Sequence, residues 1–128
     1  MRVIVDTIYQ RGLPYMHRWI LYLWACSLRV HHLRRSDVCD PHTHPWWFLS
    51  VILGRYTEEL PIDPENPAGP TRRHARWFLN WGAPHRSHRV ILDHGPVWTL
   101  VFTSPKVNSW GFHTPEGFVP WQDYRGDR

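Results

Sequence analysis

A chain of 128 residues is expected to form one domain, residues 1–128, with one hydrophobic core. Hydrophobic residues make up 42% of the sequence, which excludes a disordered chain, and a net charge of +4 with neutral histidines favours anionic ligands. No apolar run is long enough to cross a bilayer, and no signal-peptide pattern is present. The two cysteines, Cys26 and Cys39, suit a reducing compartment, and a disulfide between them is the alternative. We therefore expect a cytoplasmic protein.

Short β-strands separated by turns are predicted along the chain, because twelve prolines and eight glycines interrupt its apolar segments. In chain order, the eight predicted strands comprise residues 3–5, 19–24, 28–33, 48–53, 56–60, 89–92, 97–103 and 118–121. The strand at residues 56–60 is expected to pair with the strand at 48–53, and residues 61–73 to form a long surface loop. Strands of this number and length favour an all-β sandwich or jelly roll.

Two histidines, His42 and His44, stand immediately before the predicted strand at residues 48–53. Side chains two residues apart on an extended backbone point to the same face, so both imidazoles can reach one ion or ligand. His88, which precedes the strand at residues 89–92, is the natural third member of such a site. Neutral imidazoles held in fixed directions are good metal ligands, so the pattern predicts a histidine-lined pocket. The alternative is that these are ordinary polar residues near turns.

The His-x-His pair at residues 42 and 44, with Gly54 after it and the distant His88, resembles the two motifs of the cupin superfamily. The resemblance spans roughly residues 28–102, and residues 110–121 look like the C-terminal part of small cupin-like proteins of phages and bacteria. It implies a double-stranded β-helix, or jelly-roll barrel, in which His42, His44 and His88 hold a divalent metal ion such as Fe, Zn, Mn or Ni. The same three histidines are then the expected catalytic residues.

The sequence departs from the cupin pattern at the glutamate ligand, since Phe48 and Leu49 occupy the positions where that glutamate is expected. Glu58 or Glu59 could replace it only if the strand register turns one of them inward. A site of three histidines is one outcome, and loss of the metal with reuse of the histidines for ligand contacts is another.

Aromatic and cationic side chains supply further candidates for ligand contacts. Trp46 and Trp47 adjoin the histidine pair, where one of them could stack on a planar ligand. Arg29 or Arg55 could bind an anionic group. The remaining candidates are expected elsewhere: Trp19, Trp24, Trp98 and Trp110 in the core, and His31, His32, His85 and His94 at the surface or behind the site.

Three functions are compatible with these residues. The first is a metal-dependent cupin enzyme that acts on a small, anionic molecule. The second uses the same histidines without a metal to bind a nucleotide or cyclic nucleotide, or to cleave a phosphodiester, as a phage counter-defence protein would. The third is a scaffold whose aromatic residues form a homodimer interface. Scattered arginines argue against a nucleic-acid polymer as the partner.

Overall fold

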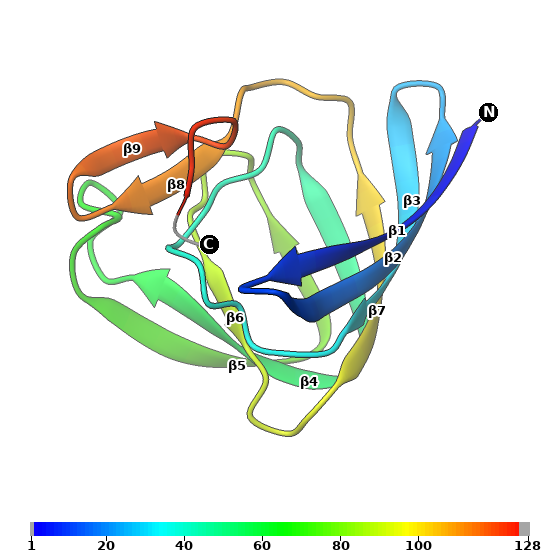
Figure 1. Cartoon of the computed structure of the whole chain (residues 1–128), viewed down its shortest axis with the longest axis horizontal. Coiled ribbons are helices and arrows are strands. Elements are labelled where there is room, and N and C mark those ends of the chain that lie inside the picture. Colours follow the sequence, from blue (N-terminus) through cyan, green and yellow to red (C-terminus); the bar gives the residue numbers. More distant parts are fainter. Residues whose placement is uncertain (1, 126–128) are drawn as a thin grey trace.

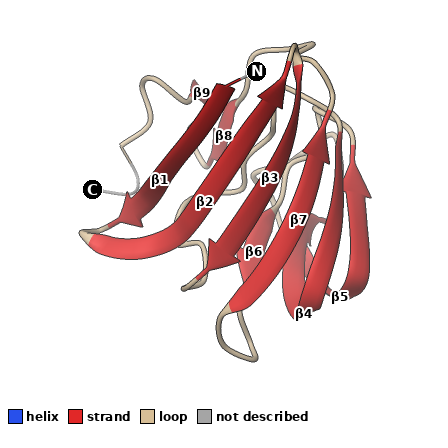
Figure 2. Cartoon of the chain, turned by 90° about the vertical axis from the view of Figure 1, so that its right-hand side faces the viewer, coloured by secondary structure: helices blue, strands red, loops and turns tan. Residues whose placement is uncertain are grey.

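The computed structural model describes residues 2–125, and every regular element among them is a β-strand (Figures 1 and 2). The strands are β1 (Arg2–Gln10), β2 (Leu13–Leu23), β3 (Cys26–Leu33), β4 (Phe48–Pro61), β5 (Thr71–Gly82), β6 (Arg89–Ile91), β7 (Val97–Thr103), β8 (Gly111–Thr114) and β9 (Gly117–Pro120). The prediction of an all-β chain is confirmed. No helix in the described part of the chain is long and apolar enough to span a membrane.

One antiparallel sheet dominates the molecule, with the strand order β1-β2-β3-β7-β4-β5 and with β6 paired to β4. Figure 2 shows its strands side by side, and Figure 1 shows the sheet curving around a central space with the β8–β9 hairpin on the opposite side. The curvature turns one face of the sheet inward, so inward side chains of strands far apart in sequence can meet.

Gly54 lies at the irregularity in β4 that turns the sheet from one layer into the other. The first part of β4 pairs with β7 up to Leu53, and Thr57 begins the pairing with β6. Gly54 has a φ of 136°, which favours glycine, and a Cβ there would lie 3.2 Å from Val97 Cγ2. The prediction that residues 56–60 form a separate partner strand for 48–53 is therefore wrong, because both segments belong to one bent strand.

Most other boundaries differ from the predictions because hairpins extend the strands beyond their apolar centres. Residues 3–5 and 19–24 lie within the long β1–β2 hairpin, and the loop predicted at residues 61–73 is shortened because β4 continues through Pro61 and β5 begins at Thr71. Cys26 is exposed and Cys39 is buried, and no disulfide joins them in the described structure.

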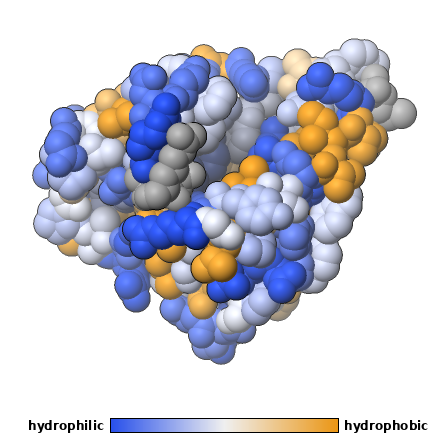
Figure 3. Space-filling model, in the orientation of Figure 1, coloured by the Kyte–Doolittle hydropathy of each residue, from blue (hydrophilic) through white to orange (hydrophobic). Residues whose placement is uncertain are grey.

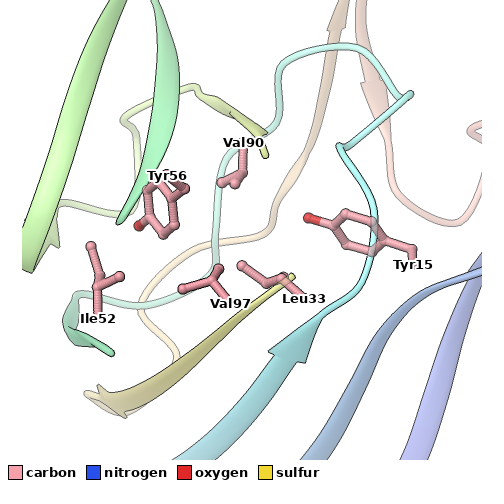
Figure 4. Packing of buried hydrophobic residues seen from close by; sticks show 6 residues of the cluster. All are labelled: Tyr15, Leu33, Ile52, Tyr56, Val90 and Val97. Carbon is pink, nitrogen blue, oxygen red and sulfur yellow. The ribbon is translucent and has the colours of Figure 1, made fainter. Parts of the chain in front are cut away.

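Alternating burial along β7 separates the inside of the barrel from its outside. Val97, Thr99, Val101 and Thr103 are buried, whereas the side chains between them are partly or largely exposed. The inner side chains join a core cluster that Figure 4 shows, formed by Tyr15, Leu33, Ile52, Tyr56, Val90 and Val97. Tyr15, Leu33, Tyr56 and Val90 of this cluster also line a cavity in the barrel interior.

The outer face of the sheet carries tryptophans that the sequence analysis assigned to the core. Trp19 and Trp98 stack on each other with ring centroids 5.7 Å apart but stay partly exposed, and Trp24 in the β2–β3 turn is 97% exposed. The prediction that these three pack in the core is wrong, because Trp19 and Trp98 lie on the open face of the sheet and Trp24 lies in a turn. Figure 3 shows apolar side chains also gathered where β1 and β2 lie.

Candidate functional site

The short segment that carries His42 and His44 joins the two sides of the barrel. His42 forms one backbone bridge with His88 and another with Phe112 of β8. The amide of His42 donates to the His88 carbonyl at 2.9 Å, and the His88 amide donates back at 3.0 Å. This pairing places the backbone of His42 directly opposite that of His88.

The three imidazoles meet inside the barrel. Their ring centroids are 5.1 Å apart for His42 and His44, 5.0 Å for His42 and His88, and 4.8 Å for His44 and His88. One ring nitrogen of each residue lies within 4.8 Å of the others. Thr43, between the pair, turns away and accepts a hydrogen bond from the Gly111 amide at 3.2 Å. The structure thus brings together the three histidines that the sequence spacing singles out.

Glu58 lies behind His88 and is completely buried. Its carboxylate accepts hydrogen bonds from His88 Nδ1 at 2.6 Å, from Asn80 at 2.8 Å and from Arg76 at 3.2 Å, and it also pairs with Arg86. Burial opposes ionisation of this carboxyl, but the hydrogen bond from His88 and the nearby positive charges outweigh it and hold the pKa at about 2. The ionised carboxylate fixes the proton on Nδ1 of His88, which leaves Nε2 as the nitrogen that can bind a ligand.

Glu59, the alternative replacement for the missing glutamate, points to the other side of β4. Its carboxylate accepts from Arg89 at 2.6 Å and lies 3.4 Å from Arg73. Neither glutamate belongs to the cluster of possible metal ligands formed by the three histidines. Glu58 instead hydrogen-bonds to His88, and Glu59 belongs to a separate ion-pair cluster.

Burial keeps the imidazoles of the pair neutral. It lowers the pKa of His42 to about 3, with a smaller contribution from His88, and it lowers the pKa of His44 well below its usual value of 6.5. Asp37 Oδ2 lies 3.4 Å from His42 Nδ1, and no hydrogen bond is formed by Nδ1 of His42 or of His44. Deprotonated ring nitrogens in a buried setting are what a metal ion requires.

A cavity of about 650 Å³ opens beside the three histidines. Inward side chains of β2 and β3 line one wall, and residues of the β8–β9 hairpin and the following segment line the other. Its cationic lining residues are Arg18, Arg29, Lys106 and Arg125, whereas Asp37 is its one acidic lining residue in the described chain. The space is large enough for a small organic molecule, and its lining favours negative charge.

Comparison of the sequence with protein-family models and with curated proteins finds no match. Solved structures do resemble the fold. A cupin 2 conserved barrel domain protein from Rhodopseudomonas palustris has a TM-score of 0.58 and 14% identity, over 90% of this chain and 80% of that one. The chain has the cupin fold.

Two further cupin-fold neighbours are enzymes by their descriptions. Fe(II)-HppE with an alternative substrate has a TM-score of 0.61 and 12% identity over 80% of this chain, and the DMSP lyase DddQ from Ruegeria pomeroyi has a TM-score of 0.54 and 17% identity over 91% of it. The chain spans 56% and 54% of the lengths of these two proteins. At such identities the likeness establishes the cupin fold alone.

Within the cupin barrel, the other predicted ligand contacts separate into two groups. Trp46 and Arg29 line the cavity, with the Arg29 guanidinium carbon 4.8 Å from the Trp46 ring centroid. The Trp46 ring also stacks on the imidazole of His44, with ring centroids 4.8 Å apart. Trp47 lies instead at a shallow outer groove, and Arg55 contacts His94 and the ring of Trp77 outside the cavity.

The sequence left the place of Glu58 open, and it did not predict that His31 lines the cavity. His31 was expected at the surface or behind the site, but it lines the cavity, and burial together with the charges of Arg29 and Arg18 lowers its pKa to about 3. The signal for His31 was present, because it stands two residues after Arg29 on one strand and so shares its face. Glu58 could not be placed because its direction depends on the bend at Gly54.

Proposed function

We propose that this cupin barrel binds one divalent metal ion through His42, His44 and His88 and acts on a small, anionic molecule held in the adjoining cavity. The observation that carries the proposal is the convergence of three buried imidazoles, two of them kept neutral by burial and the third oriented by Glu58. This donor set fits Fe, Zn, Mn or Ni, all of which accept imidazole ligands. An Fe(II) protein among the fold neighbours is compatible with the same choice.

A metal ion held by only three protein ligands keeps coordination positions for a substrate and for water or dioxygen, and it supplies Lewis-acid or redox chemistry. The residues of the chain would do the rest. Glu58 fixes the orientation of His88, and Phe48 packs against both His44 and His88, with ring centroids 5.3 and 5.9 Å away. Such packing restricts rotation of the rings and keeps water from the rear of the site.

Elemental analysis of the purified protein after reconstitution with each of the four metals tests the proposal. Wild type is expected to hold about one ion per chain, and His44→Ala to lose it. His85→Ala is the matched control, because His85 is an exposed histidine outside the site, and it should retain the metal. Wild-type protein that holds no stoichiometric metal under any of these conditions would refute the proposal.

The second candidate function is the binding or cleavage of a nucleotide-like anion without a metal. It is supported by the cationic cavity, which Trp110 and Trp121 also line with ring centroids 5.9 Å apart. A thermal-shift screen of chelator-treated protein with mono-, di- and cyclic nucleotides separates this function from the first, since a tight ligand raises the melting temperature by mass action. Absence of a shift across the panel would exclude it.

We also propose that the chain forms a homodimer through the outer face of the sheet. Trp19, Trp81, Trp98 and Phe102 are between 39% and 62% exposed on strands of that sheet, and each leaves about 100 Å² of ring surface in water. Together they expose apolar surface comparable to the largest patch of a typical monomer, and such a patch is often functional. Light scattering should give the mass of a dimer for wild type and of a monomer for Trp81→Glu, and a monomeric wild type would contradict this.

A further inference from the structure

Arg29 is a buried cation on the inner face of β3. It is 7% exposed, and its Nε donates to Ser27 Oγ at 2.9 Å. The ring centroids of Tyr22 and Trp46 lie 5.9 and 4.8 Å from its guanidinium carbon. Nε is occupied and the Tyr22 side chain is a second hydrogen-bond partner, so the remaining N–H groups of the terminal nitrogens are the donors left for a further partner.

The surroundings of Arg29 do not neutralise its charge. Asp6 is the neighbouring carboxylate, but it forms a two-point ion pair with Arg18 at 2.6 and 2.9 Å. Among the described residues, no carboxylate lies within 4.0 Å of the Arg29 guanidinium. The Asp6 carboxylate is therefore the nearby negative charge for two cations, Arg18 and Arg29. A buried charge without a counterion is costly, since the protein interior replaces the water that would otherwise solvate it.

His31 adds a second polar group without a partner next to this cation. Its Nε2 is buried and forms no hydrogen bond, and the ring is neutral because its pKa is about 3. His31 cannot supply the missing negative charge, but a neutral imidazole can donate or accept one hydrogen bond. Both His31 and Arg29 line the same cavity as the three histidines.

We propose that Arg29 is the counterion site for a compact oxyanion, a carboxylate or a phosphate or phosphonate group, on a ligand whose remainder reaches His42, His44 and His88. The inference deepens the proposed function by naming small organic acids as the ligand class, and it rests on that function only for the second end of the ligand. Oxyanion binding at Arg29 itself requires no metal.

The shape of the site restricts what can bind there. The two terminal nitrogens of a guanidinium form a fork that matches two oxygens of one carboxylate or phosphate. Tyr22 and Trp46 lie beside that fork, so a planar or tetrahedral oxyanion fits better than a bulky group. A ligand that carries a positive charge at this end would be repelled by Arg29 and Arg18.

Calorimetric titration of the chelator-treated, full-length protein tests the proposal with four probes: oxalate, malonate, methylphosphonate and inorganic phosphate. Malonamide, which has the shape of malonate without its charge, is the neutral control. At least one probe should bind wild type saturably, and Arg29→Gln should weaken that binding about tenfold or more, because a two-point charged contact is lost. The relative affinities of the carboxylates and the phosphorus oxyanions identify which oxyanion the site prefers.

Arg55→Gln is the matched control, because its guanidinium carbon also lies 4.8 Å from a tryptophan ring, that of Trp77, but outside the cavity. Arg55→Gln loses a similar charge and ring contact, but at a place outside the cavity. It should therefore bind the probe within about twofold of wild type. If Arg29→Gln does not fold, Arg29→Lys takes its place, and it should also weaken binding because lysine lacks the fork.

The proposal is overturned if none of the four probes binds wild type, if malonamide binds as well as malonate, or if the Arg29 variant and the Arg55 variant bind alike. Metal content of separate wild-type samples, reconstituted with each of the four metals and not treated with chelator, separates this inference from the proposed function. Oxyanion binding to the chelator-treated protein, together with no metal in the reconstituted samples, would leave the Arg29 site standing and refute the metal centre. Stoichiometric metal in the reconstituted samples, with no oxyanion binding to the chelator-treated protein, would refute the Arg29 site and leave the metal centre standing.

Discussion

Replacement of Glu58 by glutamine is expected to weaken both the fold and the metal site. The substitution keeps the size of the side chain but removes the charge that His88, Arg76 and Arg86 face. The new amide would also turn an NH₂ group or a neutral oxygen toward donors that now share an ionised carboxylate. The buried cationic groups would lose their counterion.

The magnitude follows from the pKa of this carboxyl. A pKa lowered from 4.5 to about 2 means that the ionised form of Glu58 contributes about 3 kcal/mol to folding at neutral pH. Because the folded-state pKa is the lower one, this contribution is complete above pH 4.5 and is lost as the pH falls toward 2. Glu58→Gln should therefore lower the free energy of unfolding by about 3 kcal/mol at pH 7, and the difference from wild type should shrink below pH 4.5.

Denaturant unfolding of both proteins at a series of pH values measures this effect, and competition with a chelator measures metal affinity. Glu58→Gln is expected to weaken metal binding by about 10- to 100-fold through His88. Glu59→Gln is the matched control, since Glu59 is the adjacent buried carboxylate with two arginine partners but no histidine. The reasoning fails if Glu58→Gln has wild-type stability at pH 7, if the difference persists unchanged at low pH, or if both variants affect the metal equally.

Three further predictions concern the backbone and the cavity. His31 is protonated only in the unfolded chain between pH 6.5 and about 3, so the stability of the protein falls as the pH is lowered through this range. In acid denaturation, His31→Asn should reduce the slope of stability against pH by up to about 1.4 kcal/mol per pH unit. An unchanged slope would contradict the burial of this ring. Gly54→Ala should destabilise the protein by about 1–3 kcal/mol in denaturant unfolding, because alanine disfavours the φ of 136° and its Cβ would contact Val97. A variant with wild-type stability would mean that β4 does not need this bend. Trp24→Gly should leave stability unchanged or raise it by up to about 1 kcal/mol, because Trp24 is almost fully exposed at a φ of 58°; a clear loss would show that the indole is packed.

The parts of the fold that follow from local pattern could be predicted from the sequence. The strand at residues 97–103 matches β7, and its alternation separates the two faces correctly, because successive side chains of a strand point to opposite sides. Which face is buried was predicted wrongly, since Trp98 was assigned to the core and lies on the outer face. The same rule places His42 and His44 on one face, and the cupin resemblance supplies His88 as their partner from a distant segment. The prediction that the chain forms one domain stays a prediction.

The remaining features depend on how separate segments meet, which no local pattern records. The bend at Gly54 made one long strand look like two, and it also decides that Glu58 rather than Glu59 faces His88. The exposure of Trp19 and Trp98 depends on which sheet face is covered, and Trp24 is exposed because it lies in the β2–β3 turn, whereas the apolar neighbours of all three favoured the core. Arg55 and Arg29 could not be ranked until the register placed one outside the cavity and the other within it.

Anomalous diffraction from crystals of the metal-reconstituted protein tests the central claim most directly. The account predicts one strong anomalous peak within bonding distance of His42, His44 and His88, about 2.0–2.2 Å from a nitrogen of each. A peak bound elsewhere, or fully loaded protein with no peak between these three imidazoles, would contradict it.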